Sequence, residues 1–111
     1  MYCTLNLTLE LNITEEQLDD IVDTASYDIG YWASFIGYDE GKYNIVEIDD
    51  DKSHVLSHED VINAILKYIN DYDSAKTILD LSNNTINTEL VDGEAADIIM
   101  QYACFGELIY G

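Results

Sequence analysis

The chain carries far more negative charge than it can neutralise internally. Its 111 residues include 23 Asp and Glu against four Lys and no Arg, which gives a formal net charge of −19. Acidic chains are often disordered, but 48% of these residues are hydrophobic, and their burial can offset the entropy of ordering. A length of 111 residues fits one domain, 1–111, that buries roughly two-thirds of its unfolded surface. The sequence therefore predicts a folded domain with a strongly acidic surface.

The same charge excludes several classes of function. Neutralising phosphates requires clustered Lys and Arg, so we expect no direct binding of DNA or RNA and no attraction to an anionic membrane. No apolar run approaches the ~20 residues of a membrane span, and no basic segment before an apolar stretch marks a secretory signal. Cys3 and Cys104 lack metal-ligand spacing and are too few for a disulfide framework. We therefore expect a cytoplasmic protein whose two cysteines are reduced core residues.

The N-terminal segment alternates between apolar and polar residues, which predicts one half-buried strand over residues 3–13. Its apolar positions are Cys3, Leu5, Leu7, Leu9, Leu11 and Ile13. Thr14 and Gln17 then have the spacing of a capping box, and apolar residues at helical spacing follow them. These signals predict a first helix that runs to about Tyr27, with Gly30 as its stop.

Two more strands and two more helices are predicted further along the chain. Residues 43–48 and 52–56 have strand character, and the three Asp residues 49–51 between them predict a hairpin. Ser57 marks the start of a second helix, and Asp92 marks the start of a third.

The remaining segments are less regular. Residues 31–38 are rich in aromatics and ambiguous, and residues 73–87 fit a short helix followed by a turn. Gly106 ends the third helix, and residues 107–110 are short enough for a closing strand or a docked tail. The economical fold is α+β, with an antiparallel sheet of about three or four strands packed on one face by about three helices.

Five carboxylates share the polar face of the first predicted helix without an intervening Lys: Glu15, Glu16, Asp19, Asp20 and Asp23. Ordinary solvated helices intersperse both signs, because like charges one turn apart destabilise a helix. Carboxylates one turn apart are separated by ~6 Å, close to the spacing of successive phosphates on a nucleic-acid strand. Such a surface can occupy the basic groove of a nucleic-acid-binding protein. Acids in predicted turns extend this candidate partner-binding surface: Asp39, Glu40, Asp49, Asp50 and Asp51.

A calcium-binding loop is an alternative interpretation of residues 49–60. Oxygen-bearing side chains fall at loop positions one, three, five, nine and twelve, as in a helix–loop–helix calcium site. The pattern has His54 where the loop needs Gly and Asp60 where it needs Glu, and a predicted strand precedes it. His54 and His58 are four residues apart, but the helix begins near His58, so we expect two surface histidines and no metal pair.

Aromatic residues cluster around a Gly-rich turn: Tyr27, Tyr31, Trp32, Phe35, Tyr38 and Tyr43. They either seal a corner of the core or form a protein interface around Trp32, since Tyr and Trp serve as interface anchors. In the second case the protein is a structural or regulatory interaction module, and its acids are only a solvated surface. No nucleophile elbow, phosphate loop, HExxH or Cys–His signature is present, so the sequence predicts neither an enzyme nor a cofactor.

Three segments of the chain resemble a group of small acidic proteins of phages and mobile elements: residues 13–25, the Gly30-Tyr31-Trp32 step and residues 95–111. The resemblance implies a phage or prophage origin and the cytoplasm of a host cell. It also implies an anti-CRISPR-like or anti-restriction-like inhibitor, because small acidic phage proteins often occupy the nucleic-acid groove of such complexes. The expected partner is a basic nucleic-acid-binding host protein, either a CRISPR effector or a restriction complex. A monomer or homodimer would bind it stoichiometrically and without turnover.

Overall fold

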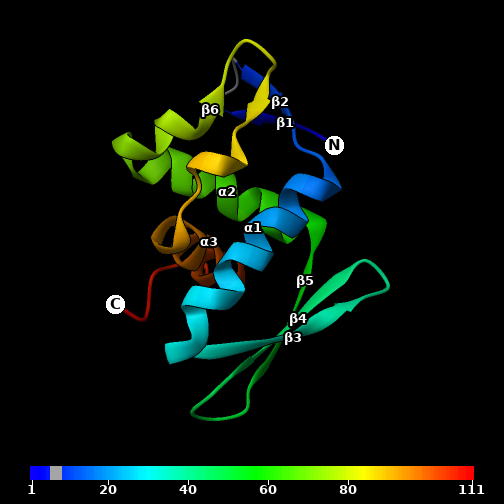
Figure 1. The fold of residues 1–111 in the computed structure, drawn as a ribbon, viewed down its shortest axis with the longest axis vertical. Coiled ribbons are helices and arrows are strands. Elements are labelled where there is room, and N and C mark those ends of the chain that lie inside the picture. The colour runs from blue at the N-terminus through cyan, green and yellow to red at the C-terminus, as the bar shows by residue number, and fades with distance from the viewer. Residues whose placement is uncertain (6–8) are drawn as a thin grey trace.

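The computed structural model describes residues 1–5 and 9–111, in which three helices pack against a three-stranded antiparallel sheet (Figure 1). The helices are α1 (Glu15–Asp28), α2 (His58–Asp71) and α3 (Gly93–Phe105). The sheet has the order β3 (Ala33–Asp39), β4 (Lys42–Glu47) and β5 (Ser53–Ser57). Two short antiparallel pairs complete the fold: β1 (Tyr2–Leu5) with β2 (Leu9–Asn12), and β6 (Leu79–Asp80) with β7 (Thr85–Ile86). The predicted α+β class is confirmed.

The N-terminal segment is a hairpin, and the prediction of one continuous strand was wrong. Strands β1 and β2 are antiparallel, with Cys3 opposite Leu11 and Leu5 opposite Leu9. Residues directly opposite each other in a hairpin lie on the same face. Odd-numbered residues of the two strands therefore share one face. A hairpin thus shows the same alternation of apolar and polar residues as one continuous strand would. The part of the prediction on residues 6–8 lies outside the described residues.

Helix α1 begins where its capping box predicts. The Thr14 hydroxyl accepts a hydrogen bond from the Gln17 amide at 3.2 Å, and the Gln17 side chain accepts one from the Thr14 amide at 2.9 Å. The apolar stripe of the helix is buried: Leu18, Ile21, Val22 and Ala25. Gly30 does not end the helix by itself, because a 3-10 turn over Ile29–Tyr31 continues from it.

The other two helices also follow local signals. A Ser57–Asp60 capping box starts α2, and the Asp92 carboxylate caps α3. Gly106 ends α3 in the left-handed conformation at φ 73°, which Gly adopts without a steric penalty. The stretch 73–87 differs from its prediction only in detail, with a 3-10 helix over Asp73–Ile78 followed by the β6–β7 pair.

The ambiguous segment 31–38 contains most of strand β3. Phe35 pairs with Ile45 and Gly37 with Asn44, so Ile36 is left between them as a bulge. A bulge adds one residue to one strand and breaks its period-two pattern, so the strand is not evident from the alternation of its residues. The predicted hairpin of β4 and β5 across residues 49–51 is confirmed.

The C-terminal residues form a docked tail, which is one of the two predicted alternatives; the other was a closing strand. Gln101 on α3 is fully buried and holds the tail backbone. Its side-chain oxygen accepts from the amides of Ile109 at 2.9 Å and Tyr110 at 2.8 Å, while its nitrogen donates to the Tyr110 carbonyl at 3.0 Å. Cys3 and Cys104 are free thiols that pack partly buried against the core, and burial raises the pKa of Cys104 to about 12.

Candidate functional site

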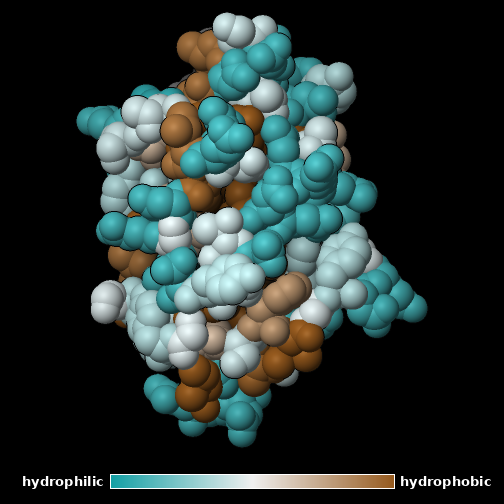
Figure 2. All heavy atoms as spheres, viewed as in Figure 1, coloured by the Kyte–Doolittle hydropathy of each residue, from teal (hydrophilic) through white to brown (hydrophobic). Residues whose placement is uncertain are grey.

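The five acids of α1 lie on its outer face, and all five are exposed. We call this set the α1 acidic row: Glu15, Glu16, Asp19, Asp20 and Asp23. Figure 2 shows hydrophilic residues gathered over this part of the molecule. The buried stripe on the opposite side fixes the orientation of the helix, so the carboxylates are displayed on a rigid support.

Almost nothing neutralises the α1 acidic row. Lys67 pairs with Asp71 at 3.1 Å and Lys76 with Asp73 at 3.4 Å, so two of the four lysines are used elsewhere. Over residues 1–5 and 9–111, the only basic side chain within 4.0 Å of the row is His58, whose Nδ1 lies 3.8 Å from Glu15. The row is therefore a source of uncompensated negative potential.

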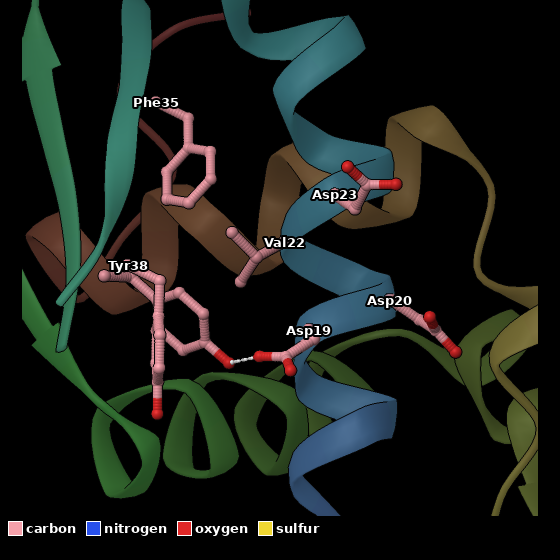
Figure 3. Close-up of a pocket in the computed structure, with 7 residues that line it drawn as sticks. Asp19, Asp20, Val22, Asp23, Phe35 and Tyr38 are labelled. Carbon is pink, nitrogen blue, oxygen red and sulfur yellow. Dashed lines mark hydrogen bonds between the residues drawn. The ribbon is translucent and has the colours of Figure 1, made fainter. Parts of the chain in front are cut away.

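A hollow of about 330 Å³ lies beside the row, between α1 and the β3–β4 hairpin (Figure 3). Its lining combines acids with apolar and aromatic side chains: Asp19, Asp20, Val22, Asp23, Phe35, Tyr38 and Tyr43. Asp19 points towards the rings, and its carboxylate accepts a 2.5 Å hydrogen bond from the Tyr43 hydroxyl. Asp20 and Asp23 point away from the rings (Figure 3). The helix thus contributes one inward carboxylate and two at the rim.

The two tyrosines that line the hollow have raised pKa values. Burial, followed by the hydrogen bond to Asp19, raises the pKa of Tyr43 well above its usual range. The pKa of Tyr38 is also raised, first by desolvation and then by the charges of Glu15 and Asp19. Desolvation disfavours a charge of either sign, so only the contributions of the Asp19 and Glu15 carboxylates to these shifts favour a cation in the hollow.

The acids of the two turns and the α1 acidic row do not form one continuous patch. Asp39 and Glu40 lie at the β3–β4 turn, whereas Asp49, Asp50 and Asp51 lie at the β4–β5 turn. These turns are at opposite ends of β4 (Figure 1), whose six residues span about 20 Å. All five of these turn acids are exposed, as predicted, but they extend the acidic surface in two separate directions.

The calcium-loop interpretation is contradicted. A loop that wraps one ion turns sharply at its sixth position, whereas that position here is His54, inside the extended strand β5. His54 lies on that strand and His58 begins α2, so their side chains belong to different elements. Within the described part of the chain, no group of three or more His, Cys, Asp or Glu side chains is arranged to hold a metal ion.

Trp32 is part of the core, which favours the first of the two interpretations of the aromatic cluster. Its side chain is 2% exposed, and its Nε1 donates to Asp97 at 2.8 Å. The ring of Tyr110 stacks on it at 5.4 Å between centroids, and Phe105 lies at the same distance. The cluster is therefore divided, with Trp32 and Tyr43 in the core and the other members partly or largely exposed: Tyr27, Tyr31, Phe35 and Tyr38.

The structure also reveals a buried polar cluster that the sequence analysis missed. Glu47 is 6% exposed, and its two carboxylate oxygens contact His54 Nε2 at 2.8 Å and the Tyr110 hydroxyl at 2.9 Å. The signal was present, because the alternation of Tyr43, Ile45 and Glu47 places all three on the inner face. This cluster fixes the C-terminal tail to the sheet.

Acid should weaken this attachment. The hydrogen bond from His54, with that from Tyr110, lowers the pKa of Glu47. A carboxyl with a lowered folded pKa stabilises the fold above its unfolded pKa of about 4.3, and that contribution is lost as the pH falls through the folded value. We expect the difference in unfolding free energy between wild type and Glu47→Gln to shrink between about pH 5 and pH 3. Glu89→Gln, at an exposed site, is the matched control, and a difference independent of pH would contradict the assignment.

Comparison with known proteins adds no relative. No family model, no curated protein and no solved structure matches the chain. Within residues 1–5 and 9–111, each helix is too short to cross a membrane.

Proposed function

We propose that the protein is a stoichiometric, non-catalytic inhibitor that occupies the basic groove of a nucleic-acid-binding protein. In this account the α1 acidic row takes the place of a phosphate backbone. The acids of the two turns enlarge the negative field that attracts the partner. The protein itself does not bind nucleic acid.

The uncompensated α1 acidic row carries this proposal. Carboxylates at positions 15, 19 and 23 follow one another along the helix at ~5.4 Å per turn, and residues 16 and 20 form a parallel pair. Within the described residues, His58 is the only basic side chain within 4.0 Å of any of them. An extended basic groove offers the missing counter-charge, and the net charge of −19 steers the encounter at long range.

The row has no evident role in the fold. Only Glu15 and Glu16 lie in the first turn, where a negative charge is favoured. The like-charge pairs Glu15–Asp19, Asp19–Asp23 and Glu16–Asp20 each cost a few tenths of a kcal/mol in a helix. Asp19 is the exception, because its carboxylate accepts a hydrogen bond from the Tyr43 hydroxyl, which an amide could still accept, although more weakly. A set of charges that weakens its own helix is best explained by binding.

The resemblance to phage and mobile-element proteins decides which partners to test first. CRISPR effectors and restriction complexes both hold nucleic acid in grooves rich in Lys and Arg. We propose that one of them is the target, in the cytoplasm of the host cell. The inhibitor would bind it as a monomer or homodimer.

Affinity capture followed by competition tests the proposed function. The protein is immobilised, incubated with a lysate of a host that carries both defence systems, and washed at low and then at high salt. We expect a basic nucleic-acid-binding protein that elutes with salt and releases its DNA or RNA when the acidic protein is added at equal concentration. A partner that stays bound in high salt, or one that keeps its nucleic acid, would contradict the proposal.

A further inference from the structure

The hollow beside the α1 acidic row has the size and lining of a pocket for one side chain. Its volume of about 330 Å³ is at the lower end of the range for ligand pockets, which is roughly 300–1,000 Å³. Val22, Phe35 and Tyr43 provide an apolar wall, and Tyr38 stands opposite the helix (Figure 3). The Tyr38 ring lies 4.9 Å from that of Tyr43, tilted by 52°, and stacks on His58 at 5.8 Å, so its neighbours hold it in place beside the hollow.

Negative charge is concentrated at one side of this hollow. Asp19 points towards the rings, and its Oδ1 accepts from the Tyr43 hydroxyl, while its other oxygen has capacity for a further donor. Asp23 lies one turn further along α1 and Asp20 is adjacent, so both add to the field at the rim. The pKa of Tyr38 on the opposite wall is raised first by desolvation and then by the charges of Glu15 and Asp19, so these two carboxylates also act on that wall.

We propose that this hollow receives one arginine side chain of the partner, with the guanidinium at the Asp19 carboxylate and against the ring of Tyr38. The inference rests on the proposed function and names the residue type that the partner would insert. Arginine fits better than lysine, because a planar guanidinium stacks on aromatic faces and offers paired donors to a carboxylate. Its alkyl stem would cover Val22 and Phe35.

A capped amino acid tests the hollow without the partner. N-acetyl-arginine methylamide is titrated into isotope-labelled protein, and chemical shifts are followed by NMR. We expect saturable shifts that centre on Val22, Phe35 and Tyr38. The citrulline analogue has nearly the same shape without the charge, so it should bind at least about tenfold more weakly, a difference of about 1.4 kcal/mol. The lysine analogue should also be weaker than arginine.

Matched variants show whether arginine binding depends on the hollow or only on the net negative charge of the protein. Asp19→Asn keeps an acceptor for the Tyr43 hydroxyl, and Glu16→Gln changes the charge equally on the same helix without touching the hollow. We expect Asp19→Asn and Tyr38→Ala to weaken arginine binding severalfold and Glu16→Gln to leave it nearly unchanged. Equal binding of citrulline or lysine, equal effects of Asp19→Asn and Glu16→Gln, or shifts spread over all acidic segments would each overturn the proposal.

The two proposals fail in different ways. If the protein displaces nucleic acid from its captured partner but shows no preference for the arginine probe, only the arginine pocket is wrong. If the probe binds as expected but no captured partner loses its nucleic acid, the pocket exists and the inhibitory function is wrong.

Discussion

Replacing Trp32 with Ala is expected to destabilise the protein by about 3–5 kcal/mol, the usual cost of removing a buried Trp or Phe. The side chain is 2% exposed and packs against Phe105 and Tyr110, so its loss leaves a cavity and removes one of the contacts that hold the C-terminal tail. It also leaves Asp97 without the indole donor. Because domains of this size are stable by only about 5–15 kcal/mol, the variant should be close to unfolding at room temperature.

Urea denaturation followed by circular dichroism measures this loss. Tyr27→Ala is the control, since Tyr27 is 83% exposed and surface substitutions usually change stability by less than about 0.5 kcal/mol. A Trp32→Ala variant as stable as wild type would contradict the burial of this residue. If that variant were stable but no longer bound the partner, an interface around Trp32 would explain binding better than the acidic surface does.

Neutralising the α1 acidic row should separate binding from stability. The variant Glu15→Gln, Glu16→Gln, Asp19→Asn, Asp20→Asn, Asp23→Asn loses three like-charge pairs at i,i+4 and two favourable charges in the first turn, and an amide replaces the carboxylate that accepts from Tyr43. Each like-charge pair or first-turn charge changes the stability by only a few tenths of a kcal/mol to about 1 kcal/mol. Removing the like-charge pairs stabilises the helix, whereas removing the first-turn charges destabilises it. We therefore expect the unfolding free energy to change by no more than about 1 kcal/mol, while partner capture at low salt is lost.

A second variant with the same change in charge shows whether location matters. It replaces five exposed acids outside the row and the hollow: Glu10, Asp73, Glu89, Glu94 and Glu107. This control should still capture the partner, because the surface that enters the groove is intact. Equal loss of capture in both variants would mean that only net charge matters, and loss of folding in the first would mean that the row has a structural role.

The parts of the fold that depend on local chemistry were predictable from the sequence. The capping boxes at Thr14 and Ser57 and the C-cap at Gly106 each involve residues within four positions of one another. The α1 acidic row was predictable for a similar reason. Helical periodicity places the five acids opposite Leu18 and Ile21, and a chain with four lysines cannot pair them all.

The parts that depend on distant pairing were not predictable. Strand β3 is disguised by the bulge at Ile36, and the N-terminal hairpin preserves the alternation of a single strand. The burial of Trp32 needs Tyr110, which is 78 positions further along the chain and is held in place by Gln101. The hollow likewise exists only because the β3–β4 hairpin folds back beside α1. Composition identified an acidic surface, and only tertiary structure showed where an aromatic wall adjoins it.

The association rate with the captured partner, measured at about 50 mM and about 200 mM salt, tests the central claim most directly. If the α1 acidic row enters a basic groove, the rate for the wild-type protein should fall at least tenfold between these conditions, because salt screens the attraction that steers the encounter. The row-neutralised variant should associate slowly at both salt concentrations. A wild-type rate that is the same at both would show that the acids do not mediate binding, and would contradict the account.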